Sequence, residues 1–229
     1  MSGLVQIQEL HPWPKTEEEA LSIQQTLRVH AIQKPLPPDC KLVAGVDTAY
    51  DPHQNLTFAA AAVFSLPDMK KVDSARASKT AEFPYIPGLH AFREGPVLLK
   101  AIRRLTVTPD VIIFTGHGIA HPRMFGLASH LGVILDCPTI GCARKRLAGQ
   151  FDPIGEEQGG SADLILRNKP VGLVYRSREK VKPIFISPGH LCTISDAVRI
   201  IIECLRGYRL PEPLRYAHRM ANRDKRESR

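Results

Sequence analysis

Three runs of strand-forming residues follow one another closely near the N-terminus, and they restrict the fold more than any other feature of this sequence. The runs cover residues 42–50, 56–66 and 70–79. Short turns that contain Asp51-Pro52 and Pro67-Asp68 separate them. Parallel neighbours need a long crossover, so strands joined this closely have to run antiparallel. The sequence therefore predicts a three-strand antiparallel meander.

Helical and strand patterns alternate along the rest of the chain. Helical patterns cover residues 92–105, roughly 125–131 and roughly 195–205, and strand patterns cover residues 110–115, 139–142, 171–176 and 184–187. A further helix starts after Thr16, which precedes Glu19 by three positions as in a capping box, and it ends before Pro35. This order predicts an α/β fold with a mixed sheet, in which the antiparallel three-strand meander is followed by parallel strands and helices flank the sheet. The ribonuclease H-like architecture is one candidate.

The length and composition are those of one domain with its own core. The chain has 229 residues, of which 43% are hydrophobic. We expect a single domain over residues 1–214 and a basic, partly disordered tail over residues 215–229. No apolar run reaches the roughly 18 residues of a membrane-spanning helix, and the first twenty residues lack a secretory signal pattern. A cytoplasmic, monomeric protein without membrane contact is expected, and the five cysteines without Cys-x-x-Cys spacing agree.

The charge of the chain favours a polyanionic partner. Lys and Arg number 31 against 23 Asp and Glu, a formal net charge of +8. Between residues 100 and 149, basic residues are interleaved with Gly and His, as in a nucleic-acid-binding surface. For the basic tail, a solvated segment without function is an equal alternative.

Two acids and one loop are candidates for chemistry. Asp47 lies in an otherwise apolar strand, where a carboxylate is costly unless it is paired or binds a cation; a water-facing edge position is the alternative. Glu94 lies near a helix start, where the helix dipole favours any acid. The loop at 115–122, Thr-Gly-His-Gly-Ile-Ala-His-Pro, follows an apolar strand, where α/β sheets place their sites. Zinc binding by His117 and His121 is an alternative that lacks a third soft ligand.

Several short motifs occur in a fixed order. They are Gly-Val-Asp at 45–47, Pro-Tyr-Ile-Pro-Gly at 84–88, Phe-Arg-Glu at 92–94, Gly-His-Gly-Ile-Ala-His-Pro at 116–122, Thr-Ile-Gly at 139–141 and Tyr-Arg-Leu-Pro-Glu-Pro at 208–213. Together they closely resemble the endonuclease V family of nucleases, which act on deaminated bases, chiefly inosine. The resemblance implies a ribonuclease H-like sheet that uses Mg²⁺, with Mn²⁺ as a substitute. It also implies hydrolysis of the second phosphodiester bond 3′ to the deaminated base in DNA, with RNA as an alternative substrate.

The resemblance assigns catalytic roles by motif position. Asp47 and Glu94 resemble the metal-binding carboxylates, and His121 resembles the active-site histidine. Asp110 matches a supporting acid, and His218 matches a late polar position of the active site in some members.

The resemblance also assigns residues that would contact the nucleic acid. A stiff wedge that helps to extrude the base would contain Pro84, Tyr85, Ile86 and Pro87. The pocket for the flipped hypoxanthine would be lined by Gly88, Gly116, Gly118 and Leu147. The basic side chains of Arg144 and Lys145 are suited to grip phosphates.

The sequence departs from the family pattern at Thr115, where members usually have a metal-binding Asp. A hydroxyl can ligate Mg²⁺ but supplies no formal charge, so we expect weaker metal binding and reduced activity. Three explanations are open. Asp110 or Glu94 compensates, the protein binds deaminated nucleic acid without cutting it, or the substitution does not belong to the natural chain. A milder departure is Arg144, where members commonly have Lys.

Two alternative functions come from other classes. A non-catalytic sensor of deaminated nucleic acid would keep the wedge and the pocket and would bind without a metal. A hydrolase that uses Ser187 and His190 in Ser-Pro-Gly-His is a weaker alternative, because no nucleophile elbow or acidic partner is evident.

Overall fold

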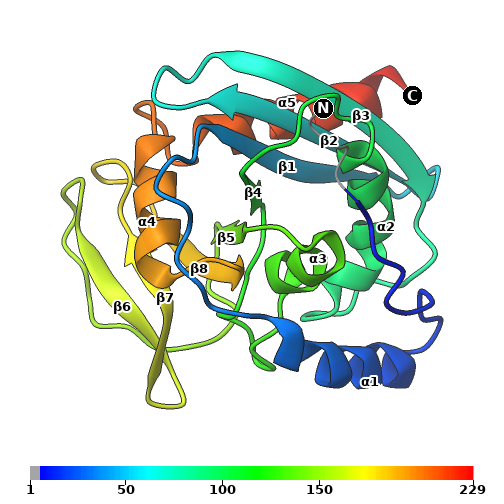
Figure 1. Ribbon diagram of the computed structural model, residues 1–229, viewed down its shortest axis with the longest axis horizontal. Helices are drawn as coiled ribbons and strands as arrows, with labels where there is room; N and C mark the ends of the chain where they lie inside the picture. Colours follow the sequence, from blue (N-terminus) through cyan, green and yellow to red (C-terminus); the bar gives the residue numbers. More distant parts are fainter. Residues whose placement is uncertain (1–5, 229) are drawn as a thin grey trace.

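The computed structural model describes residues 6–228, which form one eight-stranded sheet with helices on both faces (Figure 1). The strands are β1 (Leu42–Asp51), β2 (Leu56–Ser65), β3 (Lys71–Thr80), β4 (Val111–Phe114), β5 (Thr139–Ala143), β6 (Ser161–Leu166), β7 (Lys169–Tyr175) and β8 (Ile184–His190). The helices are α1 (Glu17–Leu27), the 3₁₀ turn η1 (Arg28–His30), α2 (His90–Ile102), α3 (Leu127–Leu135), α4 (Ile194–Glu203) and α5 (Glu212–Glu227). No helix within these residues has the length and apolar character that a membrane crossing requires.

The sheet has the strand order β3-β2-β1-β4-β5-β8-β7-β6. β1, β2 and β3 form the predicted antiparallel meander, and β4 and β5 join β1 in parallel. β8, β7 and β6 return to antiparallel pairing, so the expected parallel part is limited to β4 and β5. The predicted mixed sheet flanked by helices is confirmed. β6 was missed because Leu164 is its one buried residue, which leaves the weak pattern of a half-exposed edge strand.

Alternate residues of β1 face two separate helical layers. Ala44 and Val46 belong to the core that α2 and α3 cover, whereas Val43 belongs to the core that α4 covers. All four residues of β4 are buried, because it lies in the middle of the sheet with helices on both sides. The polar side chains of Asp47 in β1 and Thr115, which follows β4, therefore come directly after the last paired residues, Val46 and Phe114.

The C-terminal helix α5 packs across β1 and β2 and belongs to the domain (Figure 1). Its N-terminus lies so close to β1 that a Cβ on Gly45 would stand 2.3 Å from the backbone carbon of Pro213. Leu214, Ala217 and Ala221 form its buried stripe. The expected boundary after residue 214 falls inside α5, and the expected partly disordered tail is wrong as far as Glu227. The helix was missed because its buried residues are few and mostly alanine, whereas the segment as a whole is strongly basic.

Helix α1 begins with the predicted capping box at Thr16 and ends at Leu27, where η1 continues to His30. Its buried Gln24 donates hydrogen bonds to the carbonyl oxygens of Gly88, at 3.0 Å, and Phe125, at 3.2 Å. Because a buried amide is stable only with partners, these bonds fasten the loop that precedes α2. The fold thus fixes the position of the loop that contains the predicted wedge.

Candidate active site

Side chains from four elements gather where β4 ends. Asp47 comes from β1, Glu94 from α2 and His218 from α5. Thr115 directly follows β4, and its N–H donates to the carbonyl oxygen of Val46 at 3.3 Å, beside Asp47. The parallel pairing of β1 with β4 therefore brings together two motifs that lie about seventy residues apart in the sequence.

Asp47 is buried, and both of its carboxylate oxygens are engaged. Its Oδ1 accepts from the N–H of Thr48 at 2.9 Å, and its Oδ2 lies 2.7 Å from Nδ1 of His218. The Asp47 side chain is only 8% exposed, whereas that of His218 is 41% exposed. The imidazole therefore connects a buried carboxylate to the solvent. The water-facing edge alternative for Asp47 is wrong.

Glu94 approaches the same place from the opposite face of the sheet. It lies in the second turn of α2, and its carboxylate accepts a hydrogen bond from the side chain of Thr48. Burial, and after it the neighbouring negative charge of Asp47, raises the pKa of Glu94 to about 7. Two carboxyl groups that disfavour each other's charge form a site that a cation would stabilise. Thr48 was not among the predicted site residues. A threonine is common in β-strands, so nothing in the sequence marked it as functional.

Thr115 supplies a third oxygen. Among the described residues, its Oγ1 is buried and has no hydrogen-bond partner. A buried hydroxyl without a partner is costly, and a bound ligand would satisfy it. Two carboxylates and one free hydroxyl are hard oxygen donors of the kind that Mg²⁺ and Mn²⁺ accept, with water and phosphate completing the shell. The donor set of Asp47, Glu94 and Thr115 therefore fits such a cation.

Nitrogen and sulfur ligands do not supplement this set. Within residues 6–228, no three His, Cys, Asp or Glu side chains converge in a group that could hold a metal ion. Zinc binding by His117 and His121 thus finds no support, because both ring nitrogens of His121 are engaged, Nε2 with the carbonyl oxygen of Gly88 and Nδ1 with the N–H of Arg123. The candidate ligands of the cation are therefore the oxygen atoms of Asp47, Glu94 and Thr115.

Asp110 lies at the opposite end of the same strands. Its Oδ2 accepts from the backbone N–H groups of Lys41 and Leu42, both at 2.8 Å. Leu42 starts β1, and Asp47 is five residues further on, roughly 17 Å along the strand at about 3.3 Å per residue. The assignment of Asp110 as a catalytic acid is wrong, and Asp110 cannot compensate for Thr115. The resemblance identified Asp110 by its position in the chain, but it could not show that Asp110 lies at the start of β4 and the other candidates at its end.

His121 connects the predicted wedge to the loop after β4. Burial lowers the pKa of His121 to about 4, so the ring is neutral at pH 7. Its Nε2 lies 2.9 Å from the carbonyl oxygen of Gly88, and its Nδ1 accepts from the N–H of Arg123 at 3.2 Å. Arg123 also donates to that carbonyl oxygen at 3.0 Å. His121 therefore positions the loop at 84–88 and bonds to neither carboxylate.

The loop itself has the properties of a wedge. Tyr85 is 64% exposed and lies edge-on to His90, with ring centroids 5.0 Å apart. Gly88 adopts a φ of +83°, which a side chain would strain, and a Cβ there would stand 2.9 Å from Arg123. Pro84 and Pro87 flank the aromatic ring and restrict the backbone. Tyr85 and Ile86 thus lie on a short loop whose end at Gly88 is fixed by hydrogen bonds to His121 and Arg123.

The predicted base pocket is brought together only in part. Gly118 packs directly against β8, since a Cβ would stand 1.9 Å from the carbonyl oxygen of Pro188, and its N–H donates to Oγ of Ser187 at 2.8 Å. That N–H is therefore not free to read a base. Gly116 has more room, because a Cβ there would stand 3.3 Å from the nearest atom, Cδ2 of Leu127.

His117 lies between Gly116 and Gly118 and is buried. Its Nδ1 is buried and has no partner within the described part of the chain. The contact of Nε2 of the same ring with the carbonyl oxygen of Lys145 holds the segment that contains Leu147 nearby.

The basic residues Arg144 and Lys145 are exposed directly after β5. Arg144 lines the same groove as His218, the residue that bonds to Asp47. The weaker hydrolase alternative fails, because Oγ of Ser187 accepts from Gly118 and Nδ1 of His190 accepts from the N–H of Ile32 at 3.2 Å. Both side chains are buried and engaged elsewhere.

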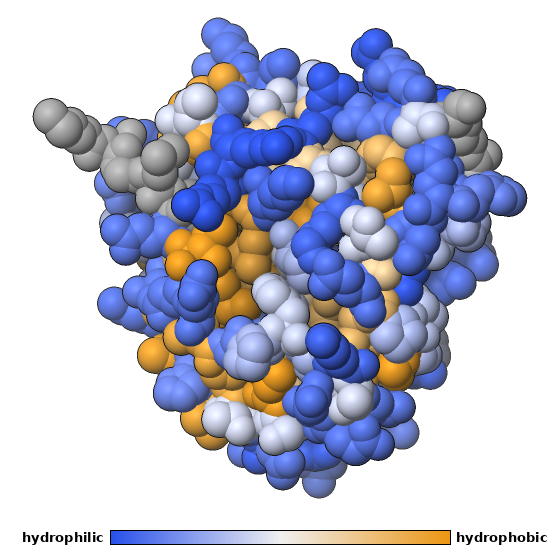
Figure 2. All heavy atoms as spheres, turned by 90° about the vertical axis from the view of Figure 1, so that its right-hand side faces the viewer, coloured by the Kyte–Doolittle hydropathy of each residue, from blue (hydrophilic) through white to orange (hydrophobic). Residues whose placement is uncertain are grey.

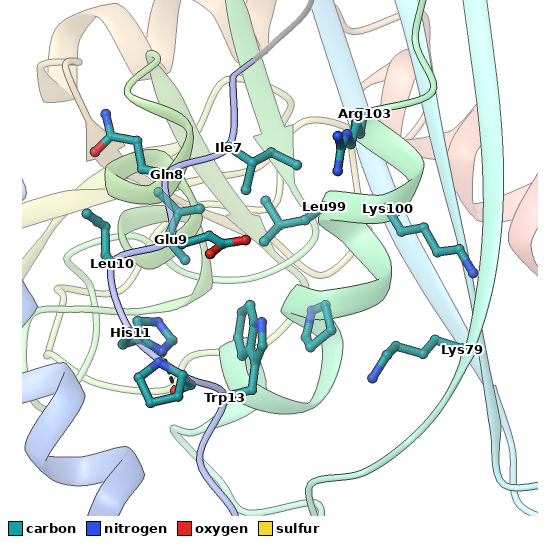
Figure 3. A pocket seen from close by; sticks show the side chains of 13 residues that line it. Ile7, Gln8, Glu9, Leu10, His11, Trp13, Lys79, Leu99, Lys100 and Arg103 are labelled. Carbon is teal, nitrogen blue, oxygen red and sulfur yellow. Dashed lines mark hydrogen bonds between the residues drawn. The ribbon is translucent and has the colours of Figure 1, made fainter.

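A cavity of about 770 Å³ lies away from these residues, between the N-terminal segment and α2 (Figure 3). Trp13 and Leu99 contribute apolar walls, and Lys79, Lys100 and Arg103 contribute positive charge. On the face turned toward the viewer in Figure 2, apolar residues show through between hydrophilic ones. None of the predicted site residues lines this cavity.

The topology and the site together define a class of protein. A mixed sheet in this order, with paired carboxylates where its central strands end, is the architecture of the ribonuclease H-like nucleases. The profile of the Endonuclease V family matches residues 23–219, which is most of the chain. The chain belongs to the endonuclease V family and is a nuclease.

Similar proteins agree in sequence and in structure. An endonuclease V from Gloeobacter violaceus is 44% identical over 216 residues, which cover 93% of this chain and 88% of that protein. The endonuclease V structure from Streptomyces avermitilis has a TM-score of 0.89 at 39% identity and covers 99% of each chain. The endonuclease V from Ciona intestinalis, solved in complex with a 24mer DNA that contains an inosine followed by a ribo-adenosine, has a TM-score of 0.80 at 27% identity and covers 93% of this chain and 98% of that one.

Proposed function

We propose that this protein is a divalent-metal-dependent endonuclease that cuts DNA at the second phosphodiester bond 3′ to a deaminated base, inosine above all. The convergence of Asp47, Glu94 and the unpartnered hydroxyl of Thr115 carries the proposal. The complex of the Ciona protein with inosine-containing DNA supports the substrate class. RNA is the alternative substrate.

Asp47, Glu94 and Thr115 would hold the cation, Mg²⁺ or Mn²⁺. When bound, such a cation neutralises charge that develops on the phosphate and lowers the pKa of the attacking water. Asp47 is held for this role by the N–H of Thr48 and by His218. The exposed His218 ring is suited to exchange a proton between the reacting phosphate and the solvent.

The lesion would be recognised on the side of α2. Tyr85 would fill the space that the extruded nucleotide leaves in the base stack. The deaminated base would enter beside Gly88, Gly116 and His117, where Nδ1 of His117 is a buried polar atom that still lacks a partner. Inosine has a carbonyl group and a ring N–H where adenosine has an amine and an acceptor, so correctly placed polar groups distinguish the two. An acceptor such as this neutral Nδ1 suits the ring N–H.

The direct test uses a 5′-labelled strand with one inosine and a matched strand with adenosine. The protein is expected to cut the inosine strand in Mg²⁺ or Mn²⁺, at the second bond 3′ to the lesion. Cutting should cease in EDTA and in Asp47→Asn. If neither the protein nor Thr115→Asp cuts, the nuclease proposal fails.

A second candidate is a sensor that binds deaminated nucleic acid without cutting it. The observation that favours it is Thr115, whose hydroxyl supplies no negative charge where the family usually has Asp. A sensor would bind inosine strands selectively in EDTA and also after Asp47→Ala. The nuclease proposal predicts instead that product appears at a low rate and that Thr115→Asp raises this rate.

The monomeric state and the cytoplasmic location remain predictions. Sedimentation of the purified protein at micromolar concentration tests the first. A mass near twice 25.4 kDa would overturn it.

A further inference from the structure

A basic groove of about 410 Å³ starts at the candidate active site and runs along α5. His218, which bonds to Asp47, is one of its lining residues. Five arginines also line it, together with Tyr208 and Leu210: Arg144, Arg178, Arg209, Arg215 and Arg219. No acidic side chain is among the lining residues, so the groove is an uninterrupted positive track.

The arginines of the groove are only partly neutralised by acids among the described residues. No ion pair among residues 6–228 involves Arg144, Arg178 or Arg209. Arg215 and Arg219 share one acid, Glu212, which lies outside the groove lining. Holding five like charges together costs free energy, which an anionic ligand would offset. A chain of phosphates is the anion that matches an extended track.

The groove is firmly built at its centre. Nη2 of Arg209 donates to the carbonyl oxygen of Arg144 at 2.6 Å and to that of Pro183 at 2.8 Å. These bonds tie the segment before α5 to the residues that follow β5 and precede β8, so the guanidinium of Arg209 is fixed before any ligand arrives. A preorganised cationic site loses less conformational entropy on binding.

Tyr208 adds an aromatic surface to this track. Its ring is 48% exposed, and the guanidinium carbon of Arg215 lies 3.2 Å from the ring centroid. Exposed aromatic rings and arginine planes in a basic groove stack with the bases of single-stranded nucleic acid. Charge along the groove and an aromatic surface within it are the two features that single-strand binding needs.

The groove and the wedge lie on different sides of Asp47. The wedge loop leads into α2, on the face from which Glu94 reaches Thr48. The groove follows α5, on the face from which His218 reaches Asp47. A strand with its lesion at the wedge and its cut bond at Asp47 would have the groove on the far side of that bond.

We propose that this groove holds the nucleotides on the 3′ side of the cleaved bond, with the arginines on the phosphates and Tyr208 against a base. The proposal rests on the proposed function, because the cut bond lies 3′ to the lesion. It identifies Arg178, Arg219 and Tyr208 as binding residues that none of the sequence motifs assigns to nucleic acid.

A coupling experiment tests the proposal. Affinity is measured in EDTA by fluorescence anisotropy for three inosine strands: one with long flanks, one trimmed to two nucleotides 3′ of inosine, and one trimmed equally on the 5′ side. For the unchanged protein, 3′ trimming should weaken binding at least about tenfold, since each stacked base and phosphate contributes. In Arg178→Ala/Arg219→Ala, the untrimmed strand should bind about tenfold more weakly, and 3′ trimming should then cost little more.

Three controls sharpen this test. Arg103→Ala, an exposed arginine near the opposite end of α2, should change nothing. Arg178→Lys/Arg219→Lys should restore most of the affinity because it keeps the charge. The slope of log affinity against log salt should fall by about 1.4 in the double alanine variant, about 0.7 for each lost single-strand phosphate contact.

Additive losses, in which 3′ trimming costs the variant as much as the unchanged protein, would overturn the proposal, as would coupling to the 5′ flank instead. A failure of the proposed function looks different. The unchanged protein would then neither cut the inosine strand nor prefer it to the adenosine strand, and the inference would fall with it.

Discussion

The two ends of the central strand pair, β1 and β4, carry the same type of residue in opposite circumstances. At the starting end, the exposed Asp110 accepts two backbone hydrogen bonds, from Lys41 and Leu42. At the other end, Asp47 is buried beside Glu94, whose pKa is raised to about 7, and beside the unpartnered hydroxyl of Thr115. One end is satisfied by the protein itself, whereas the other keeps an unpartnered hydroxyl and two neighbouring acids that a bound cation would stabilise.

The difference shows how a structural acid can be told from a functional one. The resemblance assigns a role in the active site to both Asp110 and Asp47; Asp47 lies within an apolar strand and Asp110 directly precedes one. What separates them is the environment: Asp110 is exposed, whereas Asp47 is buried and has a second acid, Glu94, beside it. Each of the following predictions tests the residues at one or both ends of these strands.

The largest expected effect is on cleavage by Asp47→Asn. Loss of one of two carboxylates that hold the cation should lower the initial rate on an inosine strand by at least about 100-fold. Asp110→Ala should leave the rate within about twofold when both variants are assayed well below their melting temperatures. Equal losses in the two variants would erase the distinction between the ends.

Thr115→Asp should strengthen the binding end. A third carboxylate beside Asp47 and Glu94 should lower the Mg²⁺ concentration for half-maximal rate by about 10- to 100-fold. The rate is measured across a Mg²⁺ titration, with Thr115→Asn as a control that adds similar bulk without charge. An unchanged midpoint in Thr115→Asp would show that position 115 does not contact the cation.

The stability of the metal-free protein should depend on Glu94 and on pH. Because the folded pKa of Glu94 is about 7 against an ordinary 4.5, the folded state holds more protons between these values. Stability should therefore fall as pH rises from about 4.5 to about 7. Glu94→Gln should remove this loss and stabilise the metal-free protein at pH 8 by up to ~3 kcal/mol, with little gain at pH 4.5.

Urea unfolding in EDTA at the two pH values measures this change. Added Mg²⁺ should reverse the order at pH 8, because it stabilises the unchanged protein and has fewer ligands in the variant. A variant that is less stable at both pH values would contradict the idea that burial and the neighbouring Asp47 disfavour the charge of Glu94.

The smallest effect is expected at the starting end. Asp110→Ala removes the acceptor for two backbone N–H groups near the surface and should cost about 1 kcal/mol of unfolding free energy. This cost should not change with Mg²⁺, and urea unfolding with and without the ion checks it. A Mg²⁺-dependent cost would connect Asp110 to the site after all.

The sequence predicted elements well where local signals were strong. The meander, the capping box at Thr16 and the apolar run of β4 all appear at or near their expected positions. The helix α5 was missed because its buried stripe is made of small residues within a strongly basic segment. Its contact with Gly45 depends on residues more than 160 positions away, and no local pattern reports such a contact.

The family, the order of the elements and the identity of most candidate residues could be read from the chain alone, because motifs and periodicity are local properties. Which of those residues act together was set only by tertiary contacts. In the folded protein Asp110 lies far from Asp47, and His218 bonds to Asp47. Thr48 donates a hydrogen bond to Glu94, and His121 contacts the wedge loop at Gly88. Strand pairing and helix packing set the distances between remote residues, and those distances decide which charges remain unsatisfied.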